Sequence, residues 1–148
     1  MHLIFIQYSA RYLYFTLKFI TMVSKITSEI KVSVTAEYDN FNSYPSENRF
    51  VFKYHIEIQN LGSETVKLLT RKWMIYDLGF GFTEVEGVGV IGLTPVLETG
   101  ETFTYFSNVI LKSGVGNMEG SYQFESFSKD NFSVEIPKFT LVSEVLSN

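Results

Sequence analysis

An alternation of apolar and polar side chains over residues 50–59 is the feature that most restricts the fold of this chain. One parity is aromatic or aliphatic throughout: Phe50, Phe52, Tyr54, Ile56 and Ile58. The other parity is polar apart from its first member and includes a histidine at position 55. A period of two places successive side chains on opposite faces of a strand. The segment therefore predicts a strand with one face buried and the other in water.

Similar strand-like runs recur along the chain, separated by clusters of Gly, Asn, Asp and Ser. They span residues 30–38, 65–69, 72–78, 82–86, 102–111, 121–127, 132–136 and 138–142. Short strands at regular spacing with turn residues between them, and no helical stretch, are typical of an antiparallel sandwich. We predict an all-β fold of the immunoglobulin or fibronectin-III type. We expect residues 30–38 to lie at a sheet edge, because a chain-terminal strand often forms the border.

Composition limits the classes of function. The length of 148 residues fits one domain, and 45% hydrophobic content is sufficient for a core. Because Cys is absent, disulfides, thiolate metal sites and Cys nucleophiles are excluded, which is consistent with a cytoplasmic protein. The net charge of −4 and the scattered basic residues argue against nucleic acid as a partner. With only His2 and His55 as histidines, we expect neither an enzyme nor a metal site, and no cofactor.

Residues 1–21 differ in composition from the rest. The segment MHLIFIQYSARYLYFTLKFIT is rich in aromatic and apolar residues but has Arg11 near its centre. It lacks the basic start and small-residue cleavage site of a secretory signal, and Arg11 disfavours a membrane helix. We interpret it as an N-terminal extension, with Met22 as the start of a single domain over residues 22–148. A genuine membrane anchor or an added packed helix remains the alternative, and no other part of the chain suggests membrane association.

Three glycines, Gly87, Gly89 and Gly92, form the pattern G-x-G-x-x-G. In dinucleotide-binding proteins this pattern precedes a helix whose N-terminus faces the phosphates. Here Gly92 is followed by Leu-Thr-Pro and then by another strand-like run. Two interpretations remain. The glycines permit positive φ and close backbone approach, or their N–H groups form a nest for an anion such as pyrophosphate.

The adjacent cations Arg71 and Lys72 are the candidate interaction residues, and Trp73 is the candidate core anchor beside them. Arg71 is predicted to be either a surface cation or a partner of the acidic residues Glu84 and Glu86 that flank the glycines.

Several segments together resemble one known family. They are 49–54 (RFVFKY), 59–62 (QNLG), 68–73 (LLTRKW), 84–92 (EVEGVGVIG), Pro95, 100–101 (GE), 118–122 (MEGSY) and 136–137 (IP). In this order and spacing they resemble the ApaG family from Met22 to about residue 142. The resemblance implies an immunoglobulin- or fibronectin-III-like sandwich and a historical association with cobalt and magnesium efflux or resistance. It also implies a role like that of related interaction domains in eukaryotic F-box proteins and in a polymerase-delta-interacting protein. It brings no catalytic residue set.

Taken together, these features predict a non-enzymatic module that binds another protein, or forms a homodimer. The alternative is a regulator that uses the segment from Gly87 to Gly92 to bind a small anion (pyrophosphate or a nucleotide) or that is linked to a metal.

Overall fold

The structure is a computed structural model that describes residues 21–143. Within this range the chain forms nine strands and two short 3-10 helices. Their bounds are β1 Thr21–Thr27, β2 Ile30–Tyr38, η1 Asn40–Asn42, η2 Pro45–Glu47, β3 Phe50–Asn60, β4 Val66–Asp77, β5 Gly81–Val88, β6 Val96–Leu97, β7 Thr102–Leu111, β8 Val115–Ser126 and β9 Phe132–Val142. The predicted extension lies outside the described residues except for Thr21, which pairs with Ala36 as the first residue of β1. No helix in residues 21–143 is long and apolar enough to cross a membrane.

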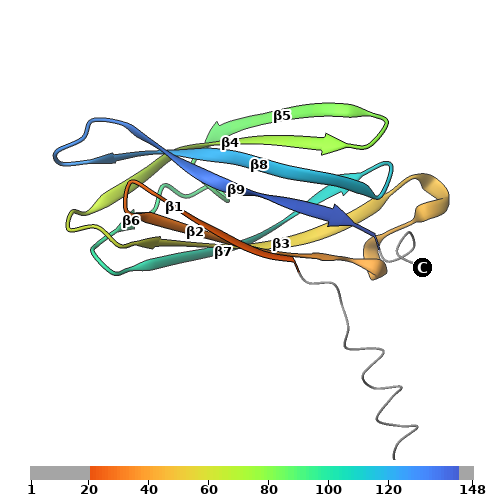
Figure 1. Cartoon of the computed structure of the whole chain (residues 1–148), viewed down its shortest axis with the longest axis horizontal. Helices are drawn as coiled ribbons and strands as arrows, with labels where there is room; N and C mark the ends of the chain where they lie inside the picture. Colours follow the sequence, from red (N-terminus) through yellow and green to blue (C-terminus); the bar gives the residue numbers. More distant parts are fainter. Residues whose placement is uncertain (1–20, 144–148) are drawn as a thin grey trace, which may run out of the picture.

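Two antiparallel sheets face each other, so the predicted sandwich is confirmed (Figure 1). One sheet has the order β1-β2-β3-β7, and the other has the order β5-β4-β8-β9. The short strand β6 pairs with β4 beyond the end of β5, so both strands lie along the same border of β4.

Strands β2 and β3 bury the parity that the sequence predicted. The inward side chains of β2 from Ile30 to Tyr38 are at most 5% exposed, and Ile56 and Ile58 of β3 are fully buried. On the outward parity of β3, Lys53 and Glu57 are exposed and His55 is partly exposed. Burial of one side of each strand follows directly from the two-residue period.

The prediction that residues 30–38 form a sheet edge is wrong. Strand β1 pairs with β2 over its whole length, with Val23 opposite Val34 and Lys25 opposite Val32. Strand β2 is therefore an interior strand, and β1 and β7 are the borders of this sheet. Strand β1 has no clear sequence signal, because Lys25 and Ile26 interrupt its alternation and most of its side chains are exposed.

The strand-like runs 65–69 and 72–78 belong to one strand, β4, which contains an irregularity. Its pairing with β8 shifts between Leu68 and Thr70, which leaves Leu69 as the extra residue of a β-bulge. The bulge reverses the parity, so Leu68 points inward before it and Trp73 points inward after it. Trp73 is 3% exposed and makes edge contacts with Tyr54 and Phe139, at ring-centroid distances of 5.5 and 6.1 Å. By the same parity, Arg71 lies on the inner side of the sheet.

Three buried tyrosines link the two sheets near Arg71. Tyr105 of β7 and Tyr122 of β8 face each other across the core, with 2.5 Å between their hydroxyl oxygens. Burial raises the pKa of Tyr105 and of Tyr122 well above the usual value, and raises that of Tyr54 of β3 as well. These hydroxyls therefore remain protonated at neutral pH.

Candidate functional site

The glycine segment connects β5 to β6 along the border of β4. Val90 N donates to Leu93 O at 2.8 Å and Leu93 N donates to Val90 O at 2.9 Å, which closes a tight turn. Both central residues are left-handed, with φ of 46° at Ile91 and 77° at Gly92. This is the backbone of a type I′ turn. The chain then continues into the two-residue strand β6, and no helix follows the glycines.

Gly89 is required by crowding as well as by its backbone angle. Its φ is 61°, and a Cβ added to it would lie 2.1 Å from Leu93 O, well inside contact distance. Gly87 leaves room for the side chain of Arg71, because a Cβ there would lie 2.9 Å from Arg71 Nη1. Backbone conformation and close approach therefore account for Gly89, whereas at Gly87 the close contact is with the end of the Arg71 side chain.

Arg71 binds the carbonyl groups of the glycine segment. Its Nη1 donates to Gly89 O at 2.8 Å and to Val88 O at 3.2 Å. The guanidinium thus holds the end of β5 against β4 and does not pair with the carboxylates of Glu84 and Glu86. Arg71 and Lys72 are adjacent in the sequence, but consecutive side chains of a strand point to opposite faces, so they do not form one pair of surface cations.

Several backbone donors of the glycine segment are already used within the chain. Gly89 N donates to Leu69 O at 2.8 Å, and the N–H groups of Val90 and Leu93 close the turn. An anion nest needs successive free N–H groups directed at one point. Anion binding by Gly87, Gly89 and Gly92 therefore stays a prediction without support from this backbone arrangement.

Lys72 lies on the outer face of the same sheet and pairs with two carboxylates of β5. Its Nζ is 2.8 Å from Glu84 Oε1 and 3.2 Å from Glu86 Oε1. The hydrogen bond with Lys72 lowers the pKa of Glu84, and the hydrogen bond with Glu84 raises the pKa of Lys72. Both groups are therefore charged at neutral pH, although their exposure to solvent weakens the attraction.

Arg71, Lys72 and Gly87, three of the predicted site residues, line one open hollow of about 410 Å³. Its other lining residues are Thr70, Glu86, Val88, Ser121 and Gln123. Both cations already have partners in the chain, so the hollow carries hydroxyl and amide groups but no unpaired positive charge.

Strand β5 is the most exposed strand of the described domain. Every residue from Gly81 to Val88 is exposed except Gly87, which is partly exposed. The strand pairs only with β4 and lies at the outer border of its sheet (Figure 1). Among residues 21–143, no strand lies beside its far edge, and nothing covers either of its faces. The position of β5 at the sheet edge could not be predicted from its residues, because the order of strands is a property of the fold.

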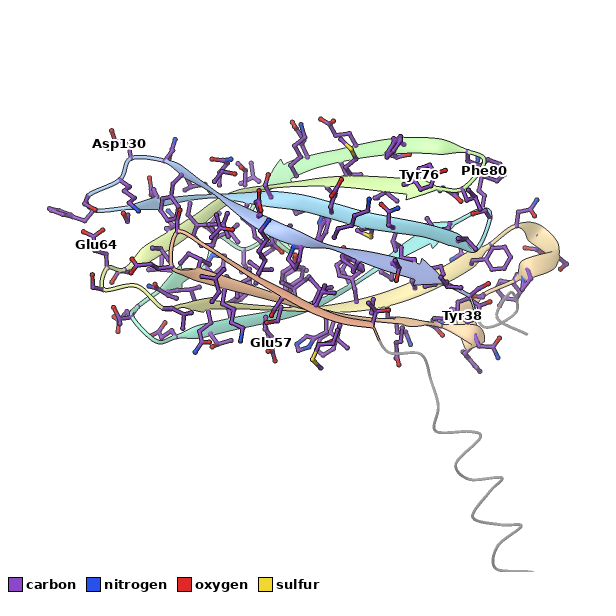
Figure 2. All side chains as sticks on the ribbon, viewed as in Figure 1. Tyr38, Glu57, Glu64, Tyr76, Phe80 and Asp130 are labelled. Atoms are coloured by element: carbon purple, nitrogen blue, oxygen red, sulfur yellow. The ribbon has the colours of Figure 1, made fainter. Side chains whose placement is uncertain are left out.

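Apolar side chains gather on β5 and on the turn that leads into it. Phe82 is 69% exposed and Val88 is 75% exposed. The turn between β4 and β5 adds Leu78 and Phe80, and Figure 2 places Tyr76 and Phe80 at this end of the hairpin. The ring of Tyr76 packs against that of Phe82, with centroids 4.9 Å apart. Exposed apolar groups along an unpaired edge strand are typical of a surface that pairs with another chain.

His55 is less exposed than Lys53 and Glu57, its neighbours on the outer face of β3. Its ring stacks on that of Phe106 of β7, with centroids 4.3 Å apart and planes 17° apart. Over residues 21–143, no group of three or more His, Asp or Glu side chains is arranged to hold a metal ion.

Comparisons with known proteins agree on one family. The family model of the ApaG domain matches residues 40–126. The chain is 45% identical over 122 residues to Protein ApaG of Rhodospirillum centenum, covering 82% of this chain and 94% of that protein. It is 43% identical over 113 residues to Protein ApaG of Thiobacillus denitrificans, covering 76% and 89% of the two chains.

A solved structure supports the same assignment. The crystal structure of the Bordetella pertussis protein described as ApaA superposes with a TM-score of 0.75 at 37% identity, covering 78% of this chain and 94% of that one. The matched sequence includes β3, β4, β5 and the glycine segment. The chain therefore belongs to the ApaG family.

Proposed function

We propose that this chain is a non-enzymatic protein-binding module that pairs with an extended segment of a partner along the free edge of β5. The observation that carries the proposal is the exposure of β5 on both faces and along its far edge. A partner strand placed there would gain main-chain hydrogen bonds, and its side chains would cover Phe82 and Val88. In this proposal, the family's association with cobalt and magnesium efflux is an effect of the bound partner.

Pairing of β5 with β4 defines which groups of β5 remain free. Gly89 N donates to Leu69 O, and these two positions are in register with the β4–β5 ladder. In an antiparallel ladder, directly opposed residues alternate between bonded and non-bonded pairs. The odd-numbered residues of β5 therefore bond to β4. The groups that remain free along the far edge are the N–H and C=O groups of Phe82, Glu84 and Glu86 and the N–H group of Val88, because Val88 O accepts from Arg71 Nη1.

Replacing Glu84 by Pro tests the proposal at this edge. The Glu84→Pro variant loses an N–H group that bonds to no strand of the domain, so the fold is expected to remain intact. We expect cell extract passed over the immobilised full chain to yield partners that Glu84→Pro no longer retains. Glu84→Gln is the matched control, because it removes the same charge and keeps the N–H group. Equal capture by the Pro and Gln variants, with both folded by circular dichroism, would refute edge pairing.

A second candidate function is small-anion binding in the hollow that Arg71, Lys72 and Gly87 line. The convergence of these residues with Ser121 and Gln123 favours it, although both cations are engaged. This alternative predicts that pyrophosphate binds with a Kd below about 100 µM and that Lys72→Gln weakens the binding. Under the edge-pairing proposal, titration calorimetry of the full chain detects no such binding. Binding that survives Lys72→Gln would place the anion elsewhere and remove this hollow as its site.

A further inference from the structure

The outer face of β5 has two acidic side chains between two apolar ones, and a strand added at its free edge would lie opposite them. Its four outer-face residues read apolar, acidic, acidic, apolar: Phe82, Glu84, Glu86 and Val88. Their N–H groups, and the C=O groups of the first three, are also the backbone groups left free along the far edge, since Val88 O accepts from Arg71 Nη1. In a strand added there, the residues directly opposite would meet both the backbone groups and the side chains of these four positions.

Carboxylates outnumber cations around this edge. Lys72 is the only cation of the outer face that pairs with Glu84 and Glu86 in the described structure. Glu119 of β8 lies in the same cross-strand row as Glu84, with Met74 between them. The guanidinium of Arg71 adds a second cation at the Val88 end of the strand. Three carboxylates and two cations leave a local charge of −1, from −3 and +2. The edge is therefore suited to a partner that brings positive charge.

A second copy of the chain does not fit this pattern. The antiparallel register that bonds all four outward-pointing residues sets Glu84 of one copy opposite Glu86 of the other, twice. Like charges directly opposite each other on neighbouring strands are destabilising. The two lysines of such a pair would face four carboxylates in the middle of the interface. Repulsion between the glutamates therefore disfavours pairing of β5 with β5 of a second copy. Phe82 and Val88 still favour pairing with a strand of another protein.

We infer that β5 binds an extended segment of another protein that carries Lys or Arg at the two positions opposite Glu84 and Glu86. Apolar residues stand at the two flanking positions, opposite Phe82 and Val88. Over seven residues the motif is apolar-x-basic-x-basic-x-apolar, and it reads the same in both directions. The apolar ends supply burial, and the basic centre selects against acidic strands. This inference rests on the proposed function and names the chemistry of its partner.

Synthetic peptides test the inference on the full chain. The probe is acetyl-Val-Thr-Lys-Thr-Lys-Thr-Phe-amide with a fluorescent label, and the matched control has Glu in place of both Lys. We expect the Lys peptide to bind at least about tenfold more tightly by fluorescence anisotropy, and to lose this advantage at high salt. In the Glu84→Gln/Glu86→Gln double variant, the two peptides are expected to bind alike. Glu84→Pro is expected to abolish binding of both.

The outcomes separate the inference from the proposed function. Equal affinity of the two peptides for the parent chain, lost in Glu84→Pro, overturns the basic motif and leaves edge pairing standing. Failure of every peptide to bind also overturns the motif, and if Glu84→Pro then retains the same extract proteins as Glu84→Gln, the proposed function falls with it. A dimer in sedimentation velocity that Glu84→Pro dissociates would assign the edge to a second copy and refute the inference.

Discussion

Replacing Gly89 by Ala is expected to lower the free energy of unfolding by about 2–5 kcal/mol, from left-handed backbone strain and from overpacking. An alanine at this position must adopt a φ near 61° or rebuild the turn. Its Cβ would also meet Leu93 O at 2.1 Å, and this carbonyl accepts the hydrogen bond from Val90 N. Relief of the clash therefore breaks the turn that leads from β5 to β6. Urea unfolding followed by Trp73 fluorescence measures the loss.

Gly92→Ala is the matched control for this prediction. Gly92 has a similar φ of 77°, but no atom lies within 4 Å of an added Cβ. Its substitution is expected to cost only the left-handed conformation, about 1–2 kcal/mol. If the two variants are equally stable, crowding at Gly89 does not explain the glycine, and a ligand-binding explanation of the motif regains support.

Alkaline pH is expected to destabilise the domain steeply. Burial raises the pKa of Tyr54, Tyr105 and Tyr122 in the folded state, so the folded chain holds these protons more tightly than the unfolded chain. Their contribution to stability is complete below pH 10, the unfolded value, and is lost as the pH rises through the folded values. The free energy of unfolding should fall by about 1.4 kcal/mol per pH unit for each tyrosine, or roughly 4 kcal/mol per pH unit for the three together.

The double variant Tyr105→Phe/Tyr122→Phe isolates this effect. It removes both members of the hydroxyl pair, which leaves no buried partner unsatisfied and keeps the ring volumes. Urea unfolding at a series of pH values above 10 should give a slope of about 1.4 kcal/mol per pH unit in place of roughly 4, after subtraction of the shared lysine titration. Identical slopes in the parent and the double variant would show that these tyrosines do not control alkaline stability.

The candidate site was predictable in its residues but not in its arrangement. Arg71, Lys72 and the three glycines stood out in the sequence, and the structure brings both cations to the end of β5. Their separate roles depend on the bulge at Leu69, which sets Arg71 on the inner side with the carbonyls of Val88 and Gly89. A bulge is decided by how two strands fit together, so local sequence does not reveal which side each cation occupies.

Local sequence determined the sandwich itself. The two-residue periods of 30–38 and 50–59 fix which side chains of β2 and β3 are buried, because strand geometry alone alternates them. Only the tertiary structure decided where the borders of the sheets lie. The weakly patterned β1 covers β2, and β5 lies uncovered at the border of the other sheet. Strand order depends on which distant segments pair. The hydrogen bonds between strands use backbone groups that every residue except proline has, so they do not identify the partner strand. The alternation of a strand therefore predicts its buried face, whereas its neighbours, and with them the free edge, are set by the packing of the whole domain.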